Sequence, residues 1–190
     1  MNRTEIKRQR QREKRLASEP KILRFAYDPN ILRFAGPIIT TDVWLSKAQI
    51  EALRAAGQPV PKAVSCRFLI DSGAYSTIVK HQFAEQAQLK LINTNSPLRG
   101  IGEDRTGKTY IGTILFGLQS QVSPTVRHII GVQTEITGAE LPHADHFDGL
   151  IGRDVLNFFD LRYNGQTGEV TMKFIGPTDK ALEPPILKST

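Results

Sequence analysis

The 190-residue chain has a single cysteine, Cys66, so it cannot form an intrachain disulfide. It also lacks any continuous run of the roughly 18 apolar residues that a membrane-spanning helix requires. Its first residues are charged rather than apolar, which does not fit a secretory signal peptide. These absences predict a soluble protein of a reducing, cytoplasmic compartment. The length suffices for one domain with a buried core and flanking tails.

The excess of positive charge is confined to the N-terminus. Residues 1–15 hold seven basic and two acidic residues, a balance of +5 that leaves +1 for the rest of the chain. The basic residues are Arg3, Lys7, Arg8, Arg10, Arg12, Lys14 and Arg15. No aromatic residues alternate with them, as stacking on bases would require, so the favoured interpretation of residues 1–19 is a solvated, flexible arm. A weak contact of residues 3–15 with nucleic acid or an acidic partner is the alternative.

An aspartate follows directly on a short apolar run. Residues 68–70 predict a buried strand, and Asp71 would stand where that strand ends. Ser72 can hydrogen-bond the backbone of the turn, and Gly73 allows another segment to approach closely. An Asx turn between two strands would explain the same residues without any catalysis. The stretch alone therefore leaves both interpretations open.

Short strand-like segments separated by turn residues make up most of the chain. The pentapeptide Ile-Leu-Arg-Phe-Ala occurs at 22–26 and again at 31–35, which predicts a hairpin or two extended segments over 20–36. Residues 134–146 are expected to form a loop. We expect strands over 38–45, 63–70, 77–79, 98–101, 108–118, 126–132, 158–163 and 169–174, and short helices over 47–56, over 80–89 and after Gly152. One face of the 108–118 strand is expected to carry Tyr110, Ile114, Phe116 and Leu118. The pattern predicts an all-β domain, mainly β with short helices, of barrel or sandwich type.

The segment Gly102–Thr109 matches the phosphate-binding pattern G-x-x-x-x-G-K-[ST] letter for letter. A phosphate-binding loop needs a buried strand before it and a helix after it, whereas residues 110–118 have the period of a strand. A P-loop nucleotide hydrolase is therefore only the third alternative. The histidines and aspartates of 143–148 have no second cluster with which to bind a metal, and Ser72 lacks the G-x-S-x-G context of a serine nucleophile. No metal or other cofactor is expected.

Three segments, in order, resemble the retropepsin family of aspartic proteases over residues 37–175. They are the apolar-Asp-Ser-Gly-Ala run Leu69–Ala74, a glycine-bearing hairpin beginning roughly thirty residues later, and the apolar-apolar-Gly-Arg segment within Gly149–Leu156. The resemblance implies a retropepsin-like acid protease barrel, one lobe per chain, with the activity of an aspartic endopeptidase. Residues 1–19, the extended segment 20–36 and the proline-containing tail 176–190 lie outside it.

The resemblance also implies roles for particular residues. They are Asp71 as the catalytic carboxylate; Ser72, Gly73 and Ala74 in the active-site turn; Gly100, Ile101 and Gly102 in a flap over a peptide or protein substrate; and Gly149, Gly152 and Arg153 as structural support. The tip of the flap is left open between 100–102 and 103–107.

Aspartic proteolysis needs two carboxylates that share a proton, and the chain has one Asp-Ser-Gly, so the two Asp71 residues must meet at the twofold axis of a homodimer. Tyr75 stands where retroviral enzymes often carry an acidic partner for the arginine at 153, which leaves the partner of Arg153 open. The main rival function is a catalytically silent module of the same fold that dimerises or binds peptides.

Overall fold

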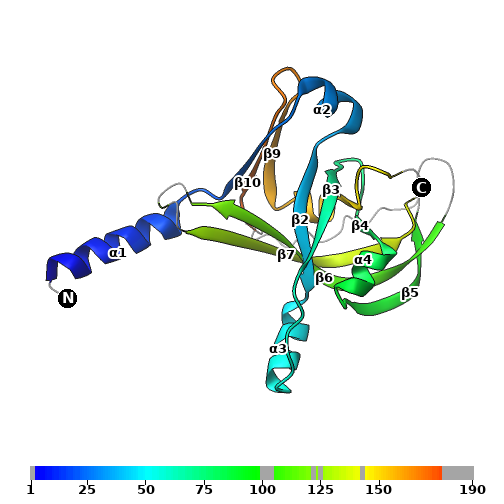
Figure 1. The fold of residues 1–190 in the computed structure, drawn as a ribbon, viewed down its shortest axis with the longest axis horizontal. Helices are drawn as coiled ribbons and strands as arrows, with labels where there is room; N and C mark the ends of the chain where they lie inside the picture. Colours follow the sequence, from blue (N-terminus) through cyan, green and yellow to red (C-terminus); the bar gives the residue numbers. More distant parts are fainter. Residues whose placement is uncertain (1–2, 99–104, 121–122, 124–125, 142–143, 177–190) are drawn as a thin grey trace, which may run out of the picture.

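The computed structural model describes residues 3–98, 105–120, 123, 126–141 and 144–176, and over these residues the chain is mainly β with short helices (Figure 1). The strands are β1 (Ile22–Ala26), β2 (Ile38–Leu45), β3 (Val64–Ile70), β4 (Thr77–Lys80), β5 (Lys90–Leu98), β6 (Arg105–Gln119), β7 (Arg127–Ala139), β8 (Gly149–Ile151), β9 (Phe159–Asn164) and β10 (Glu169–Phe174). The helices are α1 (Arg3–Ser18), α2 (Pro29–Ala35), α3 (Lys47–Ala55), α4 (His81–Gln86) and α5 (Arg153–Leu156). The expectation of a mainly β domain is confirmed.

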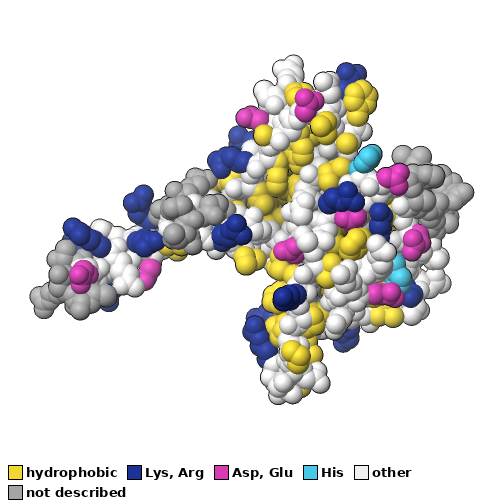
Figure 2. Space-filling view, in the orientation of Figure 1, with side chains coloured by type: hydrophobic (Ala, Val, Ile, Leu, Met, Phe, Trp, Pro, Cys, Tyr) yellow, Lys and Arg dark blue, Asp and Glu magenta, His cyan; other side chains and the backbone are white. Residues whose placement is uncertain are grey.

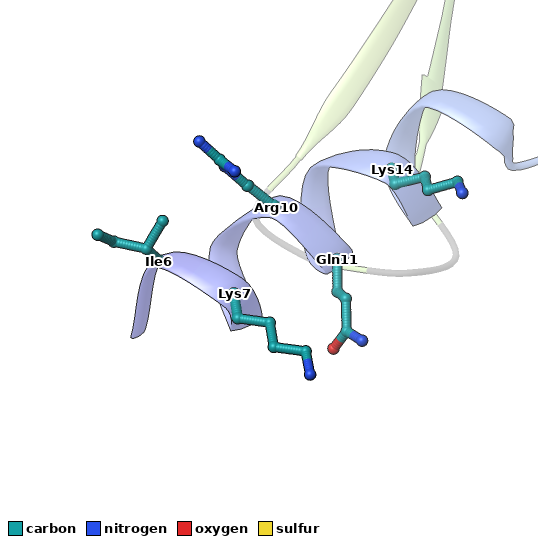
Figure 3. Close-up of a pocket in the computed structure, with 5 residues that line it drawn as sticks. All are labelled: Ile6, Lys7, Arg10, Gln11 and Lys14. Atoms are coloured by element: carbon teal, nitrogen blue, oxygen red, sulfur yellow. The ribbon is translucent and has the colours of Figure 1, made fainter. Parts of the chain in front are cut away.

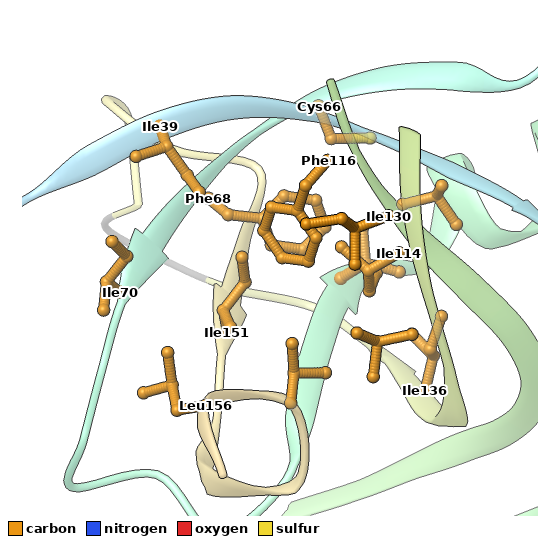
Figure 4. Close-up of a cluster of buried hydrophobic side chains, with 14 of the residues drawn as sticks. Ile39, Cys66, Phe68, Ile70, Ile114, Phe116, Ile130, Ile136, Ile151 and Leu156 are labelled. Carbon is orange, nitrogen blue, oxygen red and sulfur yellow. The ribbon is translucent and has the colours of Figure 1, made fainter. Parts of the chain in front are cut away.

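The larger sheet closes into a barrel. Its strand order is β2-β3-β8-β4-β7-β6, and β2 also pairs with residues 112–115 of β6, which closes the barrel. Residues 105–111 of β6 extend beyond this pairing and bind β5. Alternate residues of each strand face the interior, so that β3 buries Cys66, Phe68 and Ile70. Figure 4 shows Phe68 and Phe116 among aliphatic side chains contributed by several strands. The barrel is therefore filled by side chains rather than hollow.

A second sheet, of order β1-β10-β9, packs beside the barrel. The two layers meet through an aromatic cluster in which the ring centroid of Phe159 lies 5.0 Å from that of Phe116 and 5.5 Å from that of Phe174. Both ring pairs are edge-to-face, an arrangement that the ring quadrupoles favour. Because β10 pairs with β1, residues before position 37 belong to the same folded body as the barrel.

The β6–β7 hairpin is the longest pairing in the molecule and runs from Lys108↔Gly138 to Gln119↔Arg127. The four residues expected on one face of this strand, Tyr110, Ile114, Phe116 and Leu118, are all buried. The expectation of a loop over residues 134–146 is wrong for its first part, because β7 continues to Ala139. Gly138 lies within this strand, and a Cβ there would lie 2.8 Å from the Tyr110 ring. The glycine therefore makes room for an aromatic ring inside a strand.

The strand that pairs with β6 on its other side starts earlier than expected, at Lys90 instead of position 98. β5 is an edge strand, and residues 90–95 are exposed. A strand that is solvated on both faces shows no apolar alternation, so the sequence pattern did not reveal it. Helix α3 agrees with its prediction and begins with a capping box between Ser46 and Gln49.

The repeated pentapeptide adopts two different structures. Its first copy is strand β1, whereas the second lies in helix α2, so the expectation of two extended segments is wrong. Asp28 caps α2 by accepting hydrogen bonds from the backbone N–H groups of Asn30 and Ile31, and Pro29 occupies the first turn. The first copy has no such cap and pairs with β10 instead.

Residues Arg3–Ser18, expected as a flexible arm, form the helix α1, which projects from the body of the molecule (Figure 1). The space-filling view shows Lys and Arg side chains along this projection (Figure 2). Over the described residues, none of the helices combines the length and the apolar character needed to cross a bilayer.

Candidate active site

Asp71 lies at the end of β3, where that strand runs parallel to β8. The register pairs Phe68 with Gly149 and Ile70 with Ile151, and the backbone N–H of Asp71 donates to the Ile151 carbonyl over 3.0 Å. Two segments about 80 residues apart in the sequence are thus joined beside the carboxylate. The structure therefore brings together the first and third of the three segments that carry the resemblance.

The residues after Asp71 form an Asx turn. The Gly73 N–H donates to Asp71 Oδ1 over 2.8 Å, and the Ala74 N–H donates to the Asp71 carbonyl over 3.2 Å. Asp71 is half-buried, whereas Ser72 and Gly73 are exposed. Within the described ranges, no hydrogen-bond donor contacts Oδ2 of Asp71. The turn thus fixes the carboxylate through one oxygen and presents the other at the surface.

Arg153 binds the backbone carbonyl groups of this turn. Its Nη1 donates to the carbonyl oxygens of Ser72, over 2.8 Å, and Gly73, over 3.0 Å, and its own N–H donates to the Ala74 carbonyl over 3.0 Å. This answers the question that the sequence left open, because the partners are main-chain carbonyls rather than an acidic side chain. Tyr75 is 80% exposed, and among the described residues no hydrogen bond joins its side chain to Arg153. The planar guanidinium suits this task since it can reach two acceptors at once.

Gly149 and Gly152 allow backbone segments to approach one another closely. A Cβ on Gly149 would lie 2.4 Å from the Ile78 carbonyl oxygen, and one on Gly152 would lie 2.5 Å from the carbonyl carbon of Ser76. Neither glycine has a positive φ, so the requirement comes from space rather than from backbone conformation. These contacts attach β8 and the start of α5 to the segment that follows the Asp71 turn.

A buried threonine and an aspartate support the same region, and the sequence analysis did not identify them. The hydroxyl of Thr77, a fully buried residue, donates to Asp154 Oδ1 over 2.8 Å and accepts from the Gly152 N–H over 3.2 Å. Thr134 donates to the other oxygen of Asp154 over 2.9 Å. The network joins β4, β7 and α5. Asp154 is adjacent to Arg153 in the sequence, but no motif signalled that two distant threonines would meet it.

Asp148 is a buried carboxylate that directly precedes β8, whereas the Asp71 turn meets the other end of that strand. Arg67 donates to it from its backbone N–H over 2.9 Å and from its guanidinium over 3.1 and 3.2 Å, and Lys80 lies 4.0 Å away. Burial raises the pKa of the Asp148 carboxyl, but these hydrogen bonds and charges outweigh it, so the pKa lies below its ordinary value. With its acceptors occupied, Asp148 serves the barrel and not the exposed surface at Asp71.

The expected flap residues Gly100, Ile101 and Gly102 lie outside the described residues. The hairpin that leads to them is present, since β5 pairs with β6 from Lys90↔Ile111 to Leu98↔Arg105. The same strands bear on the phosphate-binding pattern. Gly107, Lys108 and Thr109 lie within β6, and Lys108 Nζ is 3.2 Å from Nε2 of His81. The helix that a P-loop requires after this segment is replaced by a strand.

Neither of two cavities in the molecule includes Asp71. One cavity, of about 280 Å³, lies between α3 and the barrel, and another runs along α1. Among the residues that the structure describes, no group of three or more His, Cys, Asp or Glu side chains could hold a metal ion. At the turn itself, Ser72 and Gly73 are exposed and Asp71 is half-buried.

Comparison of the chain with protein-family models, with curated proteins and with solved structures finds no match. What the site offers is one half-buried carboxylate on a turn whose main-chain carbonyls are held by an arginine.

Proposed function

We propose that the chain is a retropepsin-like aspartic endopeptidase that cleaves peptide bonds between the Asp71 carboxylates of a homodimer. The observation that carries this proposal is the Asp71 turn. Its backbone is held by Arg153 and by the Ile151 carbonyl, while one oxygen of the carboxylate has no donor among the described residues. A side chain held this rigidly at a surface is suited to catalysis or binding rather than to stabilising the barrel.

The chemistry requires a pair of such carboxylates. One ionised Asp71 accepts a proton from water, whose oxygen attacks the carbonyl carbon of the substrate, and the protonated Asp71 of the other chain donates to the carbonyl oxygen. The tetrahedral intermediate then collapses: the Asp71 that took the proton from water gives it to the amine nitrogen as the C–N bond breaks, and the other Asp71 takes back a hydroxyl proton as the carbonyl forms again. Two carboxylates in contact cannot both be ionised, so they share one proton and titrate as a pair.

A twofold arrangement also accounts for the exposed surface near the turn. Tyr75 is 80% exposed directly after Ala74, and a second copy that meets the turn would cover it. In that arrangement Ser72 lies at the axis and can hydrogen-bond across it. The β5–β6 hairpin would close over an extended peptide and bind its main chain, as paired strands do.

The test combines activity with mass in solution. A mixed peptide library is incubated with the wild type, with Asp71→Asn and with Asp145→Asn from about pH 4 to 7, and each protein is measured by light scattering. Asp145 is an exposed aspartate outside the proposed site and supplies the matched control. We expect cleavage by wild type and Asp145→Asn, none by Asp71→Asn, and a dimer in all three.

Two results would contradict the proposal. A wild-type dimer that cleaves no peptide over this pH range would favour the catalytically silent peptide-binding module. A wild-type protein that stays monomeric at every concentration at which it is active would remove the second carboxylate, and with it the mechanism.

A further inference from the structure

Helix α1 is a projecting element with an unusual distribution of charge. It runs from Arg3 to Ser18 and extends from the body of the molecule (Figures 1 and 2). Residues 5–15 are all exposed. Among the described residues these exposed side chains add little to the core, so they are free to meet other molecules in solution.

The basic side chains form two separate stripes. Lys7, Arg10 and Lys14 follow one another at spacings of three and four residues, and so do Arg8, Arg12 and Arg15, which places each set on one face of the helix. At about 100° per residue, the centres of the two stripes lie about 130° apart around the helix axis. Gln11 lies between them, and Figure 3 shows Lys7, Arg10, Gln11 and Lys14 extending outward from the helix.

Glu13 lies on the opposite side of the helix, and Glu5 borders the second stripe, about 20° from Arg12. Glu5 and Glu13 fall within the remaining sector of the helix, where Gln9 donates to Glu13 over 3.1 Å. The broad face that spans both basic stripes therefore contains no acidic residue. Such segregation creates a strongly positive surface, which attracts polyanions.

The last turn of α1 is anchored to the body, which fixes the direction of the helix. Leu16 is half-buried, and its carbonyl accepts a hydrogen bond from Lys21 Nζ over 3.1 Å. Arg12 donates to Ser123 over 2.7 Å, and the buried Glu19 carboxylate lies 2.7 Å from Nε2 of His128. These contacts reach the outer end of the β6–β7 hairpin. The helix is thus presented at a set angle rather than tethered loosely.

We propose that α1 binds the phosphate backbone of duplex nucleic acid, with its two basic stripes against the two phosphate walls of one groove. The major groove of B-form DNA is about 12 Å wide and admits an α-helix. Two stripes separated by a neutral strip fit a cylinder that lies between two rows of phosphates. Lysine and arginine without aromatic residues predict contacts to the backbone and little base readout.

The other surfaces that attract a basic helix fit less well. A helix that lies in a membrane interface needs a continuous apolar face, and α1 offers Ile6 and a half-buried Leu16. The same shortage argues against a helix that docks in an apolar protein groove through regularly spaced anchors. The proposal is independent of any protease activity, since it uses no residue of the Asp71 turn.

The first experiment is a fluorescence-anisotropy titration of the full chain with a labelled 20-bp DNA duplex between 50 and 200 mM KCl. If Lys7, Arg8, Arg10, Lys14 and Arg15 each contact a phosphate, log K should fall against log[salt] with a slope of about −4.5. That slope corresponds to about 500-fold weaker binding across this salt range. Single-stranded DNA and a duplex RNA of the same sequence are measured alongside. Single-stranded DNA offers no groove between two rows of phosphates, and the deep, narrow major groove of duplex RNA should exclude the helix. We therefore expect both to bind more weakly than duplex DNA.

A matched pair of triple variants separates the helix from net charge. Lys7→Gln/Arg10→Gln/Lys14→Gln removes one stripe with little change in helix propensity, and Lys47→Gln/Arg54→Gln/Lys62→Gln removes the same charge from exposed residues in and after α3. The first variant should reduce the steepness of the salt slope by about 2.7, and the second should leave it unchanged. Circular dichroism checks that both remain folded.

Several outcomes would overturn the proposal. These are no binding of duplex DNA at 50 mM salt, equal weakening in the two triple variants, or binding to phosphatidylserine vesicles without binding to DNA. Equal or tighter binding of the single strand would refute the placement of the helix in a groove.

Discussion

The contact between Gly152 and the backbone of Ser76 can be tested by a single methyl group. In Gly152→Ala the new Cβ would lie 2.5, 2.6 and 2.9 Å from the carbonyl carbon, carbonyl oxygen and nitrogen of Ser76. These are backbone atoms, so the clash cannot be relieved by a side-chain rotation. Overpacking of this kind costs about 1–3 kcal/mol. Since Ser76 is joined to the Asp71 turn, the shift should also displace the carboxylate and lower any peptidase activity.

Gly117→Ala is the matched control. Gly117 lies in strand β6, and a Cβ there would meet no atom within 4 Å. Both variants lose the same freedom in the unfolded chain, worth about 0.4–1 kcal/mol, so that term cancels when the two are compared. The free energy of unfolding is measured in urea by the fluorescence of Trp44, the one tryptophan of the chain. We expect Gly152→Ala to be less stable than Gly117→Ala by about 1–3 kcal/mol. A difference below about 0.5 kcal/mol would refute the argument from close approach.

Three further predictions concern titration, reactivity and the arginine. Because the pKa of Asp148 is lowered in the folded state, its contribution to stability is present above the unfolded value of about 3.9 and is lost as the pH falls through the folded pKa. Asp148→Asn should therefore cost about 1–3 kcal/mol at pH 7 and progressively less below pH 4, measured by urea unfolding at each pH; an unchanged difference at pH 3 would contradict this. Burial raises the pKa of the Cys66 thiol to about 12, so native protein at pH 7.5 should react with iodoacetamide at least about 10³-fold more slowly than protein in urea, followed by mass spectrometry. Rapid native labelling would show that the thiol is accessible. Arg153→Met removes both hydrogen bonds from Nη1 to the Ser72 and Gly73 carbonyls, so the amide of Ala74 should lose its protection in hydrogen exchange, whereas a retained protection factor would mean that the turn is stable without Arg153.

Much of the barrel could be predicted from the sequence because its strands bury one face. Tyr110, Ile114, Phe116 and Leu118 alternate with less buried residues, and that period requires a strand whatever the neighbouring chain does. Helix α3 was likewise predicted, over 47–56, and it runs over Lys47–Ala55. Strand β5 was missed at its start because an exposed edge strand carries no such period.

The repeated pentapeptide marks the limit of local reasoning. Five identical residues form β1 at 22–26 and part of α2 at 31–35. Their own propensities cannot differ, so the outcome is decided by Asp28 and Pro29 before the second copy and by the pairing of the first copy with β10. Tertiary pairing of this kind is invisible to any window of sequence.

For the candidate site, the sequence motifs nominate residues but do not show the contacts that support them. Asp71 and Arg153 could be picked out because their motifs stand in a recognisable order. The attachment of Arg153 to two carbonyls and of Asp154 to Thr77 depends on how β4 and β8 meet, and main-chain acceptors leave no mark on the sequence. Prediction of a site residue is thus easier than prediction of what positions it.

The pairing of β1 with β10 also sets an order in which the molecule can fold. Ile22 pairs with Lys173, 151 residues later, whereas every strand of the barrel lies between positions 38 and 151. A chain that emerges from the ribosome can therefore close its barrel before β10, the partner of β1, has been synthesised. Long-range pairings form slowly because a large loop must be closed first. The second sheet is completed only after synthesis has passed residue 174.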